Sequence, residues 1–176
     1  MSRYDEDKSM DRHIKELFYL NDTRQHQQYV AGYMIKCAKK LLDRATCHDA
    51  SKLAEPEIES HIDPVWALNN EDVEYGSERY KEITAQMGEG WEHHKAVNDH
   101  HIEHWSLANH PDSSINDPIR YMDMFALLEM LCDWVAASKR KGNDPALPID
   151  HIKKKIGYGL DPQLESILRN TLDKIK

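Results

Sequence analysis

The chain has 176 residues, of which 40% are hydrophobic and 31% are charged, the size and composition of one globular domain with its own core. Its formal net charge of −8 argues against a protein that coats nucleic acid, although a local basic pocket for one nucleotide remains compatible with it. The N-terminus lacks an apolar signal core, the apolar runs are shorter than a membrane span, and the cysteines show no paired spacing. We therefore expect a cytoplasmic protein that makes no use of a membrane.

Helical periodicity dominates the chain and predicts an all-α fold. Residues 17–20 indicate a short first helix that ends near Asn21-Asp22. Thr23 is then a suitable N-cap for a second helix that finishes around residues 44–46. That helix carries an apolar stripe, which we expect to be buried, at three- and four-residue steps: His26, Val30, Tyr33, Met34, Cys37, Leu41 and Leu42.

In the middle of the chain, Ser77 to Met87 predicts a helix. We expect Gly88 and Gly90 to loosen the chain just before a dense histidine run at 93–104. Residues 109–118 have the composition of a loop.

The strongest predicted helix runs from Ile119 to Ser138. It is apolar nearly all round, which is typical of a central helix, yet it carries Asp133 in its middle. Asp161-Pro162 predicts the start of a final helix that runs to about Leu172, with the acid as cap and proline in the first turn.

The chemistry-bearing residues are the His48-Asp49 pair, the histidine run, Asp133 and His26. Imidazoles and carboxylates are the side chains that hold first-row transition metals. A buried acid such as Asp133 needs a salt bridge, a capping role or a metal. Taken alone, a histidine such as His26 is more often a hydrogen-bonded core residue than a metal ligand.

Taken in order, His26, His48-Asp49 and Asp133 resemble the HD-domain metal-dependent phosphohydrolase superfamily, whose signature is a histidine, a His-Asp doublet and a distant aspartate on helices around one metal. More narrowly, three strings resemble a family of uncharacterised proteins common in phage and bacterial genomes, over roughly residues 20–170. They are His48 to Leu53, the run from His93 to Trp105, and Glu129 to Trp134. The resemblance implies a location in the cytoplasm of a bacterial host if the gene is phage-encoded.

The resemblance implies a single HD-domain-like helical bundle over residues 1–176. Residues 1–20 would be an N-terminal extension or short helix, 21–140 the metal-site core, and 141–176 a C-terminal loop and helix. The implied first metal is held by His26, His48, Asp49 and Asp133. Asp49 can bridge to a second metal held by histidines of the 93–104 run, so one or two divalent ions of manganese, cobalt, iron or zinc are expected.

The register of the histidine run decides which of its members are ligands. As one helix it places His94 and His101 on one face, two turns apart, and His93, His100 and His104 on the neighbouring face. Alternatively, Asn98-Asp99 breaks the run and caps a new helix. We expect His94 and His101 to be the second-metal ligands; a surface histidine cluster without metal is the alternative.

Other residues suit phosphate chemistry or support of the ligands. Lys52 can hold a phosphate oxygen as a point charge, and His93 or His100 can bind phosphate or protonate the leaving oxygen. HD-type nucleotidases often carry a glutamate at the place of Lys52, and this lysine departs from them. Glu129 and Asn98 are expected to hydrogen-bond the ligand side chains.

The favoured function is hydrolysis of a phosphate ester on a nucleotide or deoxynucleotide by a metal-activated water. The expected partner is thus a small-molecule nucleotide, and homo-oligomers are plausible. The alternatives are a diiron oxygenase of the HD type, and a non-catalytic phage protein that binds a nucleotide or counters host defence.

Overall fold

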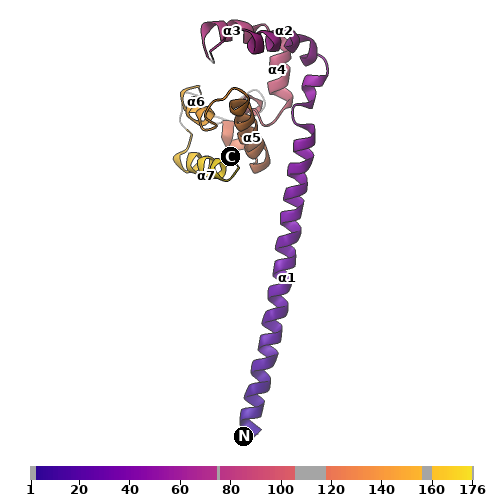
Figure 1. Cartoon of the computed structure of the whole chain (residues 1–176). Helices are drawn as coiled ribbons and strands as arrows, with labels where there is room; N and C mark the ends of the chain where they lie inside the picture. The colour runs from indigo at the N-terminus through magenta and orange to yellow at the C-terminus, as the bar shows by residue number, and fades with distance from the viewer. Residues whose placement is uncertain (1–2, 75, 106–117, 156–159, 176) are drawn as a thin grey trace. The chain divides into compact units, whose positions relative to one another are not determined.

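A computed structural model describes residues 3–74, 76–105, 118–155 and 160–175 of the chain. These residues form seven α-helices and three short 3-10 helices and contain no strand (Figure 1). The all-α prediction is therefore confirmed. Within the same residues, no helix combines the length and the apolar character that crossing a membrane would require.

The chain divides into two compact units, Met1–Thr46 and Cys47–Lys176. We expected one domain with a metal-site core at 21–140, and the division falls inside that range. The division follows the N-terminal helix, which ends at Cys47. An α-helix makes its backbone hydrogen bonds between residues four apart, so the contacts within this unit are local in sequence.

Helix α1 (Arg3–Cys47) is continuous over 45 residues, so the predicted break near Asn21-Asp22 with a cap at Thr23 is wrong. No proline occurs in α1, and its only glycine is Gly32. Asn, Asp and Thr each weaken a helix by less than about 0.7 kcal/mol relative to alanine. Ending one helix and nucleating another would cost more, because a new first turn fixes several dihedral angles for one hydrogen bond.

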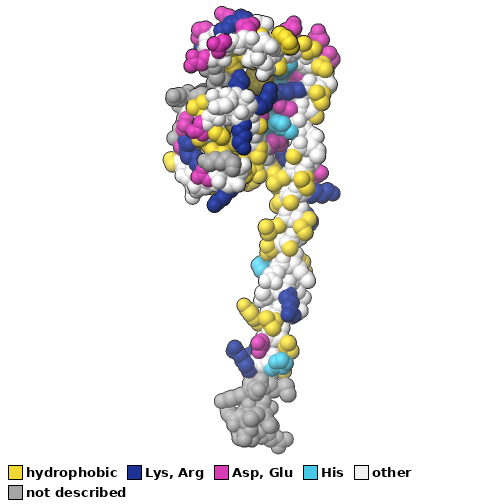
Figure 2. All heavy atoms as spheres, in the orientation of Figure 1, with side chains coloured by type: hydrophobic (Ala, Val, Ile, Leu, Met, Phe, Trp, Pro, Cys, Tyr) yellow, Lys and Arg dark blue, Asp and Glu magenta, His cyan; other side chains and the backbone are white. Residues whose placement is uncertain are grey.

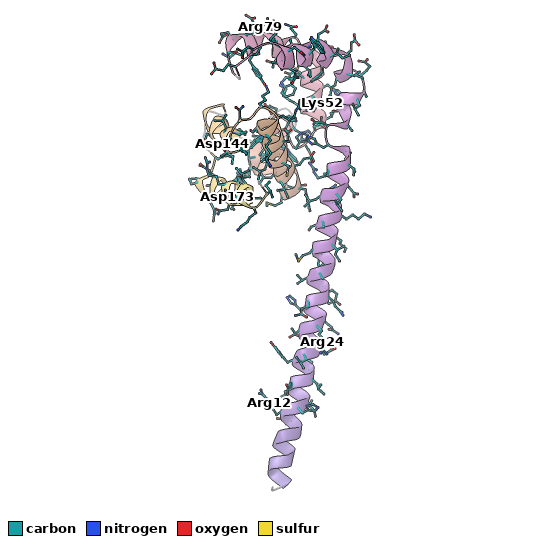
Figure 3. The ribbon with its side chains drawn as sticks, in the orientation of Figure 1. Arg12, Arg24, Lys52, Arg79, Asp144 and Asp173 are labelled. Carbon is teal, nitrogen blue, oxygen red and sulfur yellow. The ribbon has the colours of Figure 1, made fainter. Side chains whose placement is uncertain are left out.

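The predicted buried stripe of α1 is exposed in the structure. Tyr33 and Met34 are each 67% exposed, Val30 is 42% exposed, and His26 is also exposed. Hydrophobic side chains are visible along the surface of this helix in Figure 2, and Arg12 and Arg24 project from it in Figure 3. Residues 3–46 of the N-terminal unit all belong to this one helix, so they provide no second element against which the stripe could pack. A helical period in the sequence shows which residues share a face, but it does not show that the face is buried.

The first half of the second unit contains η1 (Ala50–Leu53), α2 (Glu57–Asn70), α3 (Glu78–Ala85) and α4 (Gly88–Val97). Helix α2 packs against the other three. The predicted helix from Ser77 is confirmed: the Ser77 hydroxyl accepts a hydrogen bond from the Tyr80 amide and caps α3. Pro64 lies inside α2 and does not end it.

Gly88 and Gly90 begin α4, so the expectation that they loosen the chain is wrong. Gly90 is buried where α4 crosses α2. A Cβ atom there would lie 1.7 Å from the Ser60 hydroxyl oxygen, 2.8 Å from Ser60 Cβ and 3.2 Å from the Pro56 carbonyl oxygen. The glycine therefore permits close contact of two helices that both contribute to the site described below.

The second half of this unit contains η2 (Ile102–Trp105), η3 (Pro118–Tyr121), α5 (Met124–Arg140), α6 (Leu147–Lys155) and α7 (Pro162–Ile175). Helices α5, α6 and α7 supply most of the hydrophobic core: Leu127, Met130, Leu131, Val135, Ile149, Ile152, Leu160, Leu168 and Leu172. Helix α5 presents one buried face rather than being buried all round; Cys132, for example, is exposed.

The start of α7 was predicted correctly, because the Asp161 carboxylate accepts hydrogen bonds from the amides of Gln163 and Leu164. Helix α5 begins five residues later than predicted, at an Asp123 cap that follows η3. Helix α6 was not predicted. The predicted loop at 109–118 lies outside the described residues except for Pro118.

We predict that Gly90→Ala lowers the free energy of unfolding by about 1–3 kcal/mol, because the added methyl group overpacks the contact between α2 and α4. Urea unfolding followed by circular dichroism measures the change. Gly32→Ala is the control, since no atom lies within 4 Å of its added Cβ, and alanine in α1 should be neutral or stabilising. Equal stability of the wild type and Gly90→Ala would contradict the proposed close contact.

Candidate metal centre

Asp49 lies where the chain leaves α1 and enters η1. Its backbone has φ 53° and ψ 22°, the left-handed region, and it is the only non-glycine residue with positive φ among the described residues. Aspartate tolerates this conformation better than most side chains, but the conformation still has an energetic cost. The Asp49 carboxylate faces His94 of α4 and His100 of the following segment.

The histidine run is not one helix: the chain breaks at Asn98, as the alternative expected, but the next helical segment begins only at Ile102 and is not capped by Asn98 or Asp99. Helix α4 ends at Val97, and Asn98 is extended with φ −103° and ψ 106°. The Asn98 side-chain amide donates to the His94 carbonyl oxygen at 2.8 Å and to Ser51 Oγ at 2.8 Å. The turn that follows brings His100 and His101 back against His94.

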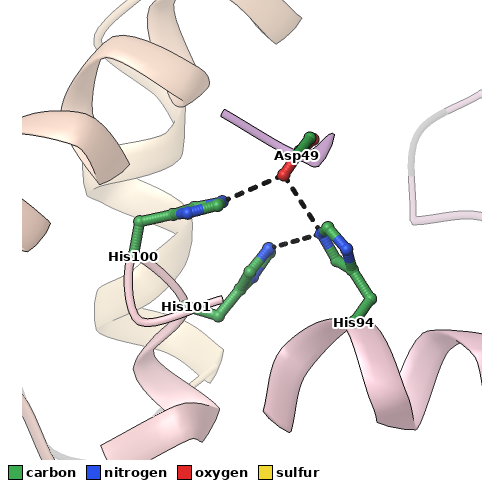
Figure 4. Close-up of side chains that lie close together, drawn as sticks. All are labelled: Asp49, His94, His100 and His101. Atoms are coloured by element: carbon green, nitrogen blue, oxygen red, sulfur yellow. Dashed lines mark hydrogen bonds and ion pairs between the residues drawn. The ribbon is translucent and has the colours of Figure 1, made fainter. Parts of the chain in front are cut away.

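Four side chains converge at this turn: Asp49, His94, His100 and His101 (Figure 4). Asp49 Oδ1 lies 3.4 Å from His94 Nε2 and 3.3 Å from His100 Nε2, and the His94 and His101 Nε2 atoms lie 2.9 Å apart. One ligand atom from each residue lies within 4.8 Å of all the others. An ion about 2.0–2.1 Å from two ligands, at tetrahedral to octahedral angles, separates those ligands by about 2.8–3.4 Å.

Asp49 Oδ1 and His100 Nε2 are buried and lie 3.3 Å from each other, but no described residue forms a hydrogen bond of good geometry with either atom. Leaving a buried polar atom unpaired costs about 1–3 kcal/mol. A cation bound between the two atoms would satisfy both at once. The group of four residues can therefore hold a metal ion, on both its spacing and its unpaired atoms.

Two carboxylates, those of Glu57 and Glu129, contact the imidazole rings at their Nδ1 atoms. Glu57 Oε2 lies 2.8 Å from His94 Nδ1, and Glu57 Oε1 lies 2.8 Å from His93 Nδ1. Glu129 Oε1 lies 2.8 Å from His48 Nδ1 and 3.2 Å from His100 Nδ1. Such contacts at Nδ1 leave Nε2 as the atom that meets a metal.

His48, His100 and Glu129 also satisfy the spacing for a second metal group. The Nδ1 atoms of both rings, however, already face Glu129 at hydrogen-bonding distance. The physical role we assign to Glu129 is therefore to orient the two imidazoles.

The environment of the cluster favours the deprotonated forms of Asp49, His94 and His101, which are the forms that bind a metal. Burial by itself would raise the pKa of Asp49, but its contact with His100 and the Lys52 ammonium, 2.6 Å from Oδ2, lower that pKa far below the usual range. Burial and the neighbouring His100 and His94 rings lower the pKa of His101 to about 3. Burial and the charge of Lys52 also lower the pKa of His94. Both rings are therefore neutral at pH 7, as metal binding requires.

His48 and Asp133, two further residues of the predicted ligand set, lie close to Asp49. His48 Nε2 lies 3.5 Å from Asp49 Oδ2 and 3.7 Å from Asp133 Oδ1, so these three residues of the expected ligand set are neighbours. His26 belongs to the N-terminal unit, where it is exposed, and neither metal group includes it. His100, expected to bind phosphate or move a proton, is one of the four grouped ligands. His93, given the same expected role, contacts Glu57 instead.

Sequence reasoning missed Glu57 and His61, which are both buried on α2. They lie four residues apart, on one face of the helix, and the His61 ring contacts the Glu57 carbonyl oxygen at 2.8 Å. An acid and a histidine at this spacing, beside an apolar Ile58 and Ile62 pattern, were the available signal. Pro56 and Pro64 obscure this signal, because proline usually interrupts a helix, whereas here Pro56 precedes α2 and Pro64 lies within it.

A family model matches residues 15–174 of the chain. The chain belongs to DUF5662, a family of unknown function. No curated protein and no solved structure matches this DUF5662 chain. The matched range includes every residue of the metal centre, and membership in DUF5662 leaves the resemblance to HD phosphohydrolases as a prediction.

We predict that the His101 ring stays neutral from pH 8 down to pH 5, because its pKa is lowered to about 3 by burial and by the adjacent imidazoles. Proton NMR measures this through the chemical shifts of the hydrogens on the His101 ring carbons, recorded as a function of pH. The spectrum of His101→Gln identifies these signals. A flat profile over that range is expected. A midpoint above pH 5 would show that the ring is not enclosed as described.

Proposed function

We propose that this chain is a metal-dependent hydrolase of phosphate esters, acting on a nucleotide or deoxynucleotide. The observation that carries the proposal is the convergence of Asp49 with three imidazole Nε2 atoms at metal-ligand spacing, two of the four atoms being unpaired. The nucleotide class rests on the resemblance of the His48-Asp49 region to HD phosphohydrolases.

The ligand set proposed for the ion is Asp49, His94, His100 and His101. Three nitrogen donors and one oxygen donor suit zinc, cobalt, iron or manganese. When bound, such an ion would lower the pKa of a coordinated water and so supply a nucleophile at neutral pH.

Lys52 makes one ion more consistent with the site than two. Its Nζ lies 2.6 Å from Asp49 Oδ2, the oxygen that a bridging aspartate would offer to a second ion. The ammonium therefore neutralises that side of the carboxylate. This argument disfavours a diiron oxygenase, which needs a second ion at the same place.

Lys52 is also suited to bind the substrate phosphate. An ammonium group has three donors, and its contact with Asp49 uses one. The Lys52 side chain is 40% exposed, so its remaining donors can meet a phosphate oxygen and offset the charge that develops on it.

His48 and Asp133, which lie beside Asp49, are suited to deliver a proton to the leaving group. Both side chains are about one-third exposed, and His48 Nε2 lies between oxygens of Asp49 and Asp133. Glu129 holds the other ring nitrogen. An imidazole oriented in this way can deliver a proton to the leaving oxygen, with Asp133 stabilising its charged form.

The first test combines elemental analysis with a screen of nucleoside mono-, di-, tri- and cyclic phosphates. The wild type should carry one transition-metal ion per chain and release phosphate. His48→Ala combined with Asp49→Ala should lose both properties while retaining its helical circular dichroism. Asp72→Ala, a change at an exposed acid of the same unit, is the control and should retain both. Undiminished phosphate release by the double variant would reject the mechanism.

The second test concerns Lys52. Lys52→Gln should reduce phosphate release by about tenfold to a hundredfold without loss of the ion, because one charge-stabilising donor is removed. Steady-state kinetics and metal content measured on the same preparation separate the two effects. Lys81→Gln, at an exposed lysine that pairs with Glu78, is the matched control. Wild-type kinetics for Lys52→Gln would remove Lys52 from the mechanism.

A further inference from the structure

Glu57, the first residue of α2, has a completely buried side chain in a mostly polar setting. Its carboxylate receives three donors: His93 Nδ1 at 2.8 Å on Oε1, and His94 Nδ1 at 2.8 Å and Ser51 Oγ at 3.0 Å on Oε2. A buried carboxylate is tolerated when its lone pairs are satisfied in this way. Ser51 lies two residues after Asp49 in η1, and His93 and His94 lie in α4, so all three donors come from segments at the metal centre.

The chemistry of a carboxylate restricts the proton positions on both rings. An ionised carboxylate only accepts hydrogen bonds, so an imidazole bonded to it donates from Nδ1. The Asn98 amide nitrogen also lies 3.0 Å from His94 Nδ1, but its two hydrogens are used by the shorter bonds to the His94 carbonyl oxygen and to Ser51 Oγ. A neutral His94 ring with its proton on Nδ1 has its lone pair on Nε2. That Nε2 atom lies 3.4 Å from Asp49 Oδ1 and 2.9 Å from His101 Nε2.

We propose that Glu57 is the positioning residue of the metal centre, which fixes the tautomer and ring orientation of His94 so that the Nε2 lone pair faces the ion site before any ion binds. The inference rests on the metal centre of the proposed function, but not on phosphate hydrolysis. Ser51 reinforces the arrangement, because it donates to Glu57 and accepts from the Asn98 amide that ends α4.

The structure defines an informative substitution. Glu57→Gln keeps the shape of the side chain but replaces one acceptor oxygen by an NH2 donor. The amide can accept from only one of the two imidazoles, and its NH2 group faces the Nδ1 atom of the other. If that ring is His94, its proton must move to Nε2, where it blocks the metal.

Cobalt(II) alone is the probe, titrated into the full-length chain and followed by its visible absorption. We expect Glu57→Gln to bind cobalt about tenfold to a hundredfold more weakly than the wild type, with an altered visible spectrum, because loss of an orienting partner typically has this effect. Glu59→Gln makes the same chemical change at an exposed site two residues along α2, and should bind within threefold of the wild type. Glu57→Leu removes both acceptor oxygens whichever way the amide of Glu57→Gln is oriented, so wild-type affinity and spectrum in a folded Glu57→Leu protein would overturn the inference.

A measurement on the wild type covers the case in which Glu57→Gln does not fold. Nitrogen-15 NMR of histidine-labelled protein reports which ring nitrogen carries the proton, with His94→Gln used only to assign the signals. A proton on His94 Nδ1 is expected in the metal-free protein, and a proton on Nε2 would overturn the inference. Cobalt binding without phosphate release would reject the proposed function alone, whereas unchanged binding by folded Glu57→Leu rejects this inference alone.

Discussion

The centre depends on one buried carboxylate, that of Asp49, which is held at a left-handed turn with Oδ1 against two imidazole nitrogens. A carboxylate oxygen and imidazole nitrogens that carry lone pairs repel one another unless a cation lies between them, so this arrangement favours a bound metal ion. Lys52 balances the other oxygen and helps to keep Asp49 ionised. Without this carboxylate, the Nε2 atoms of His94 and His100 would lose the one oxygen atom that faces them both.

The supporting structure repeats one device on two sides. Glu57 from α2 and Glu129 from α5 each face two imidazoles through Nδ1. Three of these rings, His48, His94 and His100, direct Nε2 at Asp49. Helices α2 and α4 pack closely through Gly90, and α5 is anchored in the core with α6 and α7. The positions of the ligands are therefore determined by packing as well as by hydrogen bonds, which is a condition for binding an ion with little reorganisation.

Local signals were sufficient for part of this description. The all-α class, the Ser77 helix start and the Asp161 cap follow from periodicity and from side chains that satisfy free helix amides. The association of Asp49 with His94 and His101 was also anticipated, although for a different reason: a shared helix face was expected, whereas a turn after Asn98 brings His101 back to His94.

The rest depends on tertiary contacts that a single sequence does not reveal. The continuity of α1 reflects small propensity differences at Asn21, Asp22 and Thr23, which look like punctuation but are too weak to end a helix. Gly90 looked like a flexible point, yet it is required by the contact with Ser60. No helix was predicted around Glu57, and only the fold shows that this acid is buried beside two histidines.

X-ray absorption spectroscopy of the zinc-loaded chain tests the metal centre most directly, because it counts imidazole rings around the ion without requiring a substrate. Zinc bound at Asp49, His94, His100 and His101 should show a nitrogen and oxygen shell at about 2.0–2.1 Å, with the scattering of about three imidazole rings. A shell with one imidazole or none, or a chain that retains no zinc, would contradict the centre described above.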